Sequence, residues 1–544
     1  MNAPIVKFNI KDLSFSVANV LKGISGVQGI TLRGPHAKPD LLITTWNQFV
    51  ATYGGYISNS DFPLLCKRAF DRGVQLRVSR VGHYTDVTDP STLDAVLGTW
   101  VKAKTLTFSA ALVTSNQVDM TINGTPITPV TFATDSDTTM AAVATAIKAV
   151  TTYVEDAFVV TLTGGSSNDR VIVVLPKTTT LSITGLAVTL GASQATITQA
   201  NINNIPSTTG VGLFSWSPKW KGEDYNNLKL TISAASNGNT SYFDMTISHI
   251  NDSSLTETYQ NLNIPGNQTI PNQHWLDNVM AASQLVNFNY LDLTGITGRP
   301  YNSNYYINSG SDGSAVQATD YTGDPAGNTG FYAFDSVDDM LQIAVPELST
   351  SSINIAGSAY SANRKDLMFY AHLDNSNTTR AALVSARETT SIDSIYTAFF
   401  AGGIKITDPI SGTEKSISEM GDVLGIMAFN DEEGQWLSPA GLNRGVIPNA
   451  LGVVNNFGTN AKYNDLNILA NRQINMVVQK DGVIYLNGNY SAQLANSKLS
   501  FLSHIRFLIW LQKTLTPTLK RYLQEPGDIP TFKALYLEVQ PFLD

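Results

Sequence analysis

The chain has 544 residues, a formal net charge of -9 and a pI near 5.2, and only 15% of its residues are charged. At roughly 150 residues per domain, this length predicts three or four structural units. The single cysteine, Cys66, excludes an intrachain disulfide framework and a cysteine-based metal site. The acidic balance, with no cluster of lysine or arginine, argues against sequence-independent binding to nucleic acid.

The low share of charged residues indicates a surface that is polar but neutral, or that is covered by other chains. The N-terminus lacks the continuous apolar core of a signal peptide. The most apolar helical stretch, residues 501–511, contains His504 and Arg506 and is too short to span a bilayer. We therefore expect a chain that folds in a reducing cytoplasm and does not insert into a membrane.

The first predicted element is a strand at residues 5–17, where apolar residues alternate with a period of two. Such a strand at the end of a chain has no local partner, so it must pair with the body of the protein or with another chain. We predict an intersubunit arm, and pairing within the same chain is the alternative. The apolar residues of the arm are Val6, Phe8, Ile10, Leu13, Phe15 and Val17.

The next hundred residues begin as an α/β unit. Residues 23–35 predict a strand that ends at a Gly-Pro turn, and residues 44–56 predict a helix that stops at two glycines. A second helix is expected from an Asp61 cap to residue 72, followed by a strand at 74–81.

The composition changes at residue 96. From there to residue 205 the chain is rich in threonine and has few charged residues. A hairpin is expected around Asn123-Gly124, because Asn-Gly favours the tight turn between two strands. One helix at 138–150 and several further strands complete the segment. Residues 96–205 therefore predict an inserted, mostly-β domain.

Strands are again expected after residue 206, and strand-helix alternation resumes near residue 366. A late hairpin should turn at Asp481-Gly482. Two helices are expected at 499–524 and 530–542, the first of them kinked by Pro517. The whole pattern predicts an α+β fold of several domains, with mixed α/β elements in the core.

The sequence shows no pattern typical of a catalytic or metal site. The six histidines are at least 25 residues apart, and no phosphate-binding loop or serine nucleophile motif is present. Residues 308–320 partly match the pattern of an EF-hand calcium-binding loop. Gly310 and Thr319 occupy two positions where that loop needs carboxylates, so a surface loop is favoured. The acids at 431–433 predict a solvated turn, because neighbouring side chains in a loop diverge. We expect no enzyme activity, metal or cofactor.

Several stretches together resemble one family. These are "GVQGITLRGPHAKPDLLITTWNQFVATYGGY", "CKRAFDRGVQLRVSRV", "WSPKWKGEDYNNLKLTIS", "SGSDGSAVQATDYTGDPAGNTGFYAFDSVDDMLQIAVPE", "KITDPISG", "GIMAFNDEEGQWLSPAGLNRGVI" and "LNILANRQINMVVQKDGVIYLNG". In this order they resemble the contractile tail sheath proteins of bacteriophages and related injection systems, over about residues 1–95 and 206–544. The chain departs from the family at "APIVKFNI", where "PGVY-E" is frequent, and at its end, "VQPFLD", where the family usually continues into a strand arm.

The resemblance implies a domain plan: an arm at 1–20, a first core part at 21–95, an outer domain at 96–205, a middle domain at 206–360 and a tube-facing α/β domain at 361–544. It implies a subunit of a helical sheath that polymerises around an inner tube and contracts to drive it through a target cell envelope for genome delivery. The implied partners are further copies of the chain, the inner tail tube, and the baseplate and tail terminator proteins. The implied location is the virion, after assembly in the cytoplasm of a host bacterium.

The resemblance also implies that the C-terminal helices face the tube, where Lys513, Lys520 and Arg521 would meet acidic groups; a solvated helix face is the alternative. The loop at 434–441, "GQWLSPAG", resembles a structural loop of the sheath core, in which we expect Trp436 to be buried. Other readings of the chain as a whole are a surface adhesin or glycan-binding protein, with 96–205 as the binding module, a baseplate structural protein, or a hydrolase of cell-wall or capsule polymer.

Overall fold

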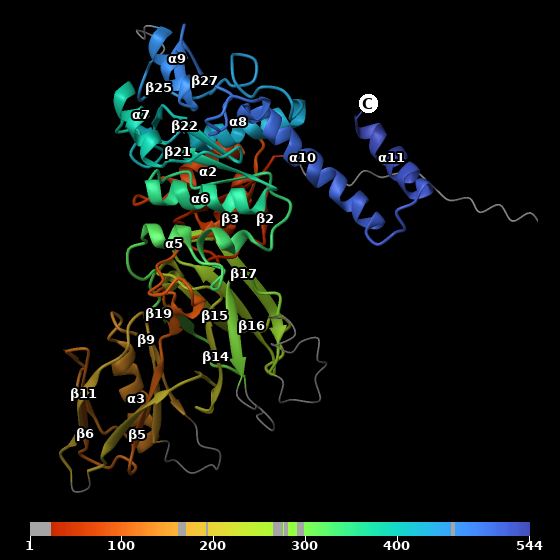
Figure 1. The fold of residues 1–544 in the computed structure, drawn as a ribbon. Helices are drawn as coiled ribbons and strands as arrows, with labels where there is room; N and C mark the ends of the chain where they lie inside the picture. The colour runs from red at the N-terminus through yellow and green to blue at the C-terminus, as the bar shows by residue number, and fades with distance from the viewer. Residues whose placement is uncertain are drawn as a thin grey trace, which may run out of the picture.

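The computed structural model describes residues 23–160, 170–191, 194–264, 276, 281–290, 299–457 and 463–543. The predicted arm strand at 5–17 lies outside these residues. The chain forms an elongated molecule, with an α/β body at one end, β-sheets at the other and a helical hairpin that projects from the α/β body (Figure 1). With 27% of the chain in helix and 31% in strand, spread over several sheets, the expected α+β fold of several domains is confirmed.

One eight-stranded sheet forms the α/β body. Its six inner strands are mutually parallel, and the strand at each edge is antiparallel to its neighbour. The inner strands are almost wholly buried, as expected for parallel strands covered on both faces. The strand order is β2 (Leu42–Ile43), β3 (Gln75–Arg80), β1 (Ile24–Gly29), β20 (Gln342–Ala344), β21 (Met368–His372), β22 (Thr397–Ala401), β26 (Ile474–Lys480) and β27 (Val483–Asn487).

Helices cover both faces of this sheet and bury two separate apolar clusters against it. Side chains of one face pack with α1 (Trp46–Tyr53), α2 (Phe62–Phe70), α8 (Met420–Glu433) and α10 (Leu502–Leu519). The other face packs with α5 (Ala318–Thr322), α6 (Ser351–Arg364), α7 (Arg380–Thr389) and α9 (Tyr463–Asn471). A small sheet of β24 (Glu414–Ile417), β23 (Ile404–Thr407) and β25 (Gly452–Val453) lies beside the first face.

The middle of the chain forms two antiparallel sheets around one core. The larger sheet has the order β17 (Asp252–Leu262), β16 (Phe243–His249), β15 (Leu228–Ala234), β19 (Asn304–Asn308) and β4 (Thr99–Trp100). The smaller one has the order β13 (Ile205–Pro206), β14 (Gly212–Pro218) and β18 (Val286–Tyr290). Their inner faces meet through buried Phe214, Trp216 and Phe243.

The threonine-rich segment forms two further sheets and one helix, α3 (Ser136–Lys148), which lies at the far end of the molecule (Figure 1). The sheets are β12 (Ile197–Ile202), β5 (Ala103–Phe108), β10 (Val171–Pro176) and β9 (Val154–Val160), and β11 (Ile183–Thr189), β6 (Gln117–Ile122), β7 (Thr125–Pro126) and β8 (Val130–Thr131). The expected turn at Asn123-Gly124 is confirmed, with φ angles of 45° and 81°. Phe158 and Leu175 belong to the core of the middle sheets, so the segment is packed onto them.

One local expectation is wrong because a partner from far along the chain replaces the local one. The Asp61 side chain makes no capping hydrogen bond to α2; it pairs with Lys415, and Glu347 accepts the Asp61 backbone N–H at 2.9 Å. The loop at 308–320 is mostly exposed or half-buried, as expected for a surface loop, but its last residue, Asp320, is fully buried. Its carboxylate accepts the backbone N–H of Tyr84 at 3.0 Å and ties the loop to the body.

Candidate functional site: the C-terminal helical hairpin

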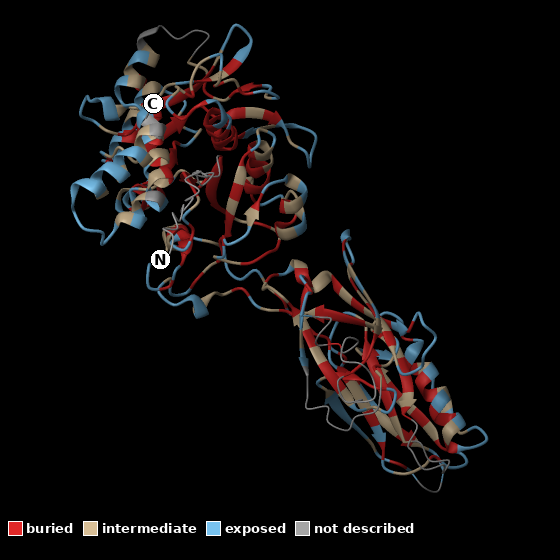
Figure 2. Ribbon diagram, turned by 90° about the vertical axis from the view of Figure 1, so that its right-hand side faces the viewer, coloured by how far each residue is buried: buried red, intermediate tan, exposed pale blue. Residues whose placement is uncertain are grey.

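The predicted site residues with described positions lie on one projecting element. Helix α10 leaves the α/β body, passes through the short 3-10 helix η6 (Lys520–Tyr522), and is followed by α11 (Ile529–Leu543) (Figure 1). Pro517 lies inside α10, which ends two residues later and gives way to η6. Helix α11 and the end of α10 are largely exposed, in contrast to the buried strands of the body (Figure 2). We call residues 502–543 the C-terminal hairpin.

The first half of α10 is anchored in the body by an apolar stripe. Leu502, Ile505 and Ile509 are buried in the same cluster as α8 and the main sheet. Their spacing of three and four residues places them on one face of the helix. The body therefore fixes the direction in which the hairpin leaves it.

A buried ion pair reinforces this anchor. Arg506 donates from Nη2 to Asp431 Oδ1 at 2.5 Å and to the Met427 carbonyl at 2.9 Å, and both charged side chains are almost fully buried. Burial works to lower the pKa of Arg506, but the charge of Asp431 outweighs it and raises that pKa. The expectation of a solvated turn at 431–433 is thus wrong: these acids end α8, and Asp431 points into the core.

Lys513 belongs to the contact between hairpin and body. Its Nζ donates to Asp366 Oδ2 at 3.0 Å and to the Asp338 carbonyl at 2.6 Å. Arg364 also donates to Asp366, from Nε and Nη2, at 2.9 Å each. Burial works to raise the pKa of Asp366, but these cations outweigh it and hold that pKa below its ordinary value.

The other two predicted tube-facing residues lie elsewhere. Lys520 and Arg521 are neighbours on η6, beyond Pro517, and both are exposed. The structure therefore brings Lys520 and Arg521 together at the tip of the hairpin and places Lys513 at its root.

Helix α11 carries an exposed apolar stripe that was not predicted from the sequence. Ile529, Phe532, Tyr536 and Leu537 are between 59% and 82% exposed, and they recur at the spacing of one helix face. The signal was present as the spacing within "IPTFKALYLEVQ", but the sequence alone does not tell which helix faces are covered. Contiguous exposed apolar side chains of this kind mark an interaction surface.

The loop "GQWLSPAG" lies at the root of the hairpin, and the expectation that Trp436 is buried is wrong. Trp436 is 57% exposed and meets Phe507 of α10 edge-on, with ring centroids 6.3 Å apart. Phe507 in turn stacks with Trp510 at 6.0 Å. Gly434 has a φ of 153°, and a Cβ there would lie 3.0 Å from the Trp436 ring, so this position requires glycine.

The part of the chain that the structure describes holds no cluster of three or more histidine, cysteine, aspartate or glutamate side chains able to bind a metal. Within the same residues, no helix combines the length and the apolar character needed to cross a membrane. The predicted arm residues, Val6 to Val17, lie outside the described ranges.

Comparison with known proteins gives structural matches only, since no protein-family model and no curated protein matches the sequence. A sheath tail protein from Listeria innocua aligns with 96% of this chain and 83% of its own, at a TM-score of 0.52 and 9% identity. A sheath tail protein from Desulfitobacterium hafniense aligns over 99% and 88%, at a TM-score of 0.48 and 13% identity. The helical sheath of the anti-feeding prophage, in its contracted state, covers 39% of this chain, at a TM-score of 0.32 and 17% identity. The Listeria protein shows that this chain has the fold of a sheath tail protein, which confirms the expected resemblance at the level of the fold.

Proposed function

We propose that this protein, which has the fold of a sheath tail protein, is a structural subunit of a contractile tail sheath. In this role it polymerises with copies of itself around an inner tube and contracts to drive the tube through the envelope of a target cell for genome delivery. The observation that supports this proposal most is the fold shared with the Listeria sheath tail protein over 96% of the chain. The role is structural rather than catalytic, and it needs no cofactor.

The charge and apolar distribution of the chain supports assembly. Only 15% of the residues are charged, and the C-terminal hairpin presents an exposed apolar stripe on α11 together with Lys520 and Arg521. An element that carries apolar side chains away from the body is suited to contact a neighbour rather than solvent. A contact between unlike surfaces of identical copies continues into rings or helical polymers.

Contraction requires that subunits slide past one another without separating. A strand added to the sheet of a neighbour meets this requirement, because its backbone hydrogen bonds can persist while the bodies rotate. We assign this task to the arm residues at 5–17. The energy of contraction lies in the difference between two packings of the subunits, and a kinetic barrier holds the extended one.

The proposal assigns the tip of the hairpin to the inner tube. Lys520 and Arg521 would meet acidic groups on the tube, while Lys513 holds the hairpin to its own body through Asp366. The other partners are the baseplate and the tail terminator at the two ends of the sheath. The assembled protein belongs to the virion tail.

Negative-stain electron microscopy of the protein expressed alone tests the proposal. A sheath subunit is expected to form hollow, striated cylinders, because its contacts repeat along a helix. Monodisperse single particles at all concentrations would count against a sheath subunit and would favour the adhesin or baseplate reading.

A further inference from the structure

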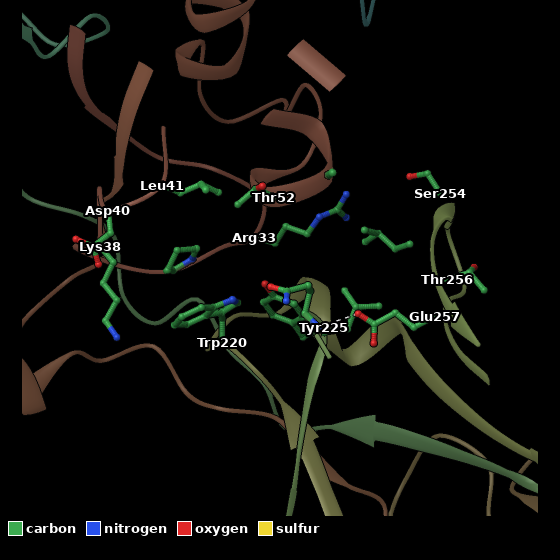
Figure 3. A pocket seen from close by; sticks show the side chains of 15 residues that line it. Arg33, Lys38, Asp40, Leu41, Thr52, Trp220, Tyr225, Ser254, Thr256 and Glu257 are labelled. Atoms are coloured by element: carbon green, nitrogen blue, oxygen red, sulfur yellow. Dashed lines mark hydrogen bonds between the residues drawn. The ribbon is translucent and has the colours of Figure 1, made fainter. Parts of the chain in front are cut away.

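The described residues line two cavities of about 460 Å³ each. The first lies between the α/β body and the middle sheets, with Leu41, Trp220 and Tyr225 in its largely apolar walls (Figure 3). The second lies where the chain passes from the middle sheets into the inserted segment and returns, and we call it the polar cleft. Its hydroxyl and amide side chains are those of Thr99, Asn203, Ser215, Ser217, Asn287 and Asn289.

Two paired strands build one wall of the polar cleft. Ser215 and Ser217 of β14 alternate with Trp216, which is buried in the core, so the two serines lie on the opposite face of the strand. On β18, Asn289 is directly opposite Ser215, and Asn287 is directly opposite Ser217. Side chains that are directly opposite in an antiparallel pair share a face. This wall therefore carries two hydroxyls and two amides side by side.

The rest of the lining comes from the two points where the chain crosses to and from the inserted segment. Thr99 of β4 and Lys102, just before β5, belong to the outgoing crossing, and Asn203, just after β12, belongs to the returning one. Trp100 holds the two crossings together, because its Nε1 donates to the Asn203 carbonyl at 3.0 Å. Trp100 is itself buried in the core of the middle sheets, so this wall has a fixed position.

The polar side chains of the cleft are unused within the subunit. None of its three hydroxyls and three amides, nor Lys102, makes a side-chain hydrogen bond or ion pair with another residue in the described part of the chain. Trp216 also lines the cleft, and its buried indole N–H has no acceptor among the same residues. A buried donor without an acceptor is unfavourable. A ligand that brings hydrogen-bonding oxygens would therefore be stabilised here.

These groups match the chemistry of a saccharide. Each amide and each hydroxyl both donates and accepts hydrogen bonds, as the closely spaced hydroxyls of a sugar ring do. The apolar C–H faces of a sugar suit aromatic side chains, and Trp100, Trp216 and Phe288 belong to the lining. Lys102 is the one charged residue in the described lining, so a neutral or acidic sugar is favoured over a cationic one.

We propose that the polar cleft is a saccharide-binding site, which takes a neutral or acidic sugar and uses Asn287 and Asn289 as hydrogen-bonding groups to its hydroxyls. This site goes beyond the proposed sheath function and does not depend on it. In a sheath, a site beside the segment 96–205, which resembles an outer domain, would allow the outside of the assembly to hold the polysaccharide of a cell surface.

Binding of the full-length protein to printed oligosaccharides tests the proposal. One set is neutral, with glucose, galactose and N-acetylglucosamine units; a second is acidic, with uronic acids; a third is cationic, with unacetylated glucosamine. The protein should bind members of the neutral or the acidic set. No binding to any set, or best binding to the cationic set, would overturn the proposal.

A double variant locates the site. Asn287→Ala with Asn289→Ala removes two exposed amides from an edge strand of the described sheets, so the fold should stay intact. In calorimetric titration, its affinity for the best-bound oligosaccharide should fall by about tenfold or more. The matched control, Thr258→Ala with Gln260→Ala, removes two exposed polar side chains from the edge strand β17 and should change that affinity by less than about twofold. An unchanged affinity in the asparagine variant would place the sugar elsewhere and refute the site.

Cylinder formation separates this proposal from the sheath function. The asparagine variant should form cylinders as the unaltered protein does, because the cleft serves a sugar rather than a neighbouring copy. A variant that keeps its circular dichroism but forms no cylinders, while the unaltered protein binds no oligosaccharide, would make the cleft a contact between copies and refute the saccharide site. Sugar binding by a protein that never forms cylinders would instead refute the sheath function and leave the saccharide site standing.

Discussion

At the scale of single residues, the stability of the hairpin root depends on charges buried in the body. Arg506 and Asp431 are both almost fully buried and satisfy each other. Removing one partner of such a pair leaves an uncompensated charge in a site that water cannot reach. Truncating either side chain therefore destabilises the fold. This holds even if an apolar pair at the same two positions would be equally stable.

We predict that Arg506→Ala lowers the free energy of unfolding by about 3–5 kcal/mol, because Asp431 is left buried without its partner. Chemical denaturation of a variant that lacks residues 1–17, and so stays monomeric, is the measurement. Lys520→Ala, at an exposed position, is the control and should change stability by less than about 0.5 kcal/mol. Equal losses in both variants would refute the role of the buried pair.

The lowered pKa of Asp366 leads us to predict that the stability of the contact between hairpin and body depends on pH. Its pKa in the folded protein is held below the ordinary value of 3.8, so it contributes stability above that value. This contribution should be lost as pH falls through the lowered pKa. Asp366→Asn should flatten the decline in melting temperature below about pH 4, whereas the exposed control Asp481→Asn should not. Identical pH profiles in both variants would rule out Asp366 as the source.

At the scale of elements, the arm and the hairpin have separate tasks. We predict that deletion of residues 1–17 leaves a folded monomer that no longer polymerises, because the body is complete without the arm while the strand exchange is lost. Circular dichroism checks the fold, and sedimentation checks assembly. If the deletion variant formed normal cylinders, the arm would not be required for polymerisation.

The tip of the hairpin gives the clearest test of the tube contact. Lys520→Glu with Arg521→Glu should leave cylinders intact but prevent their binding to the inner tube, because two attractive charges become repulsive. Co-sedimentation with preassembled tubes is the measurement. Lys102→Glu with Lys104→Glu, where the segment 96–205 packs onto the middle sheets, is the control of equal charge. Tube binding by the hairpin variant would contradict the assignment. Lys513→Glu is unsuitable, because it would also break the ion pair with Asp366.

Elements with a strong local signal were predictable from the sequence. The hairpin at Asp481-Gly482 and the helix expected at 138–150 have strong local signals, and both are present, the helix as α3. Features that depend on distant partners were not predictable. Asp431 is buried because Arg506 meets it from 75 residues away, and Trp436 is exposed because the loop lies beside α10 rather than beneath it. Among the candidate site residues, the sequence indicated the basic tip but not the exposed stripe on α11.

At the scale of the whole molecule, the α/β body and the middle sheets are joined where the chain crosses between them. The chain leaves the eight-stranded sheet after Arg80 and returns to it at Gln342. Buried arginines hold this junction: Arg33 pairs with Asp224 and Asp252, and Arg80 pairs with Asp312 at 2.8 Å. The junction also borders a cavity of about 460 Å³, which Arg33, Trp220 and Tyr225 help to line.

We propose that this chain is the repeating unit of a hollow helical sheath. The most direct test is helical reconstruction, by electron cryomicroscopy, of the assemblies that the purified protein forms. We predict a hollow tube in which the C-terminal hairpin lines the lumen. A solid filament, a lumen lined by residues 96–205, or protein that stays monomeric at all concentrations would contradict it.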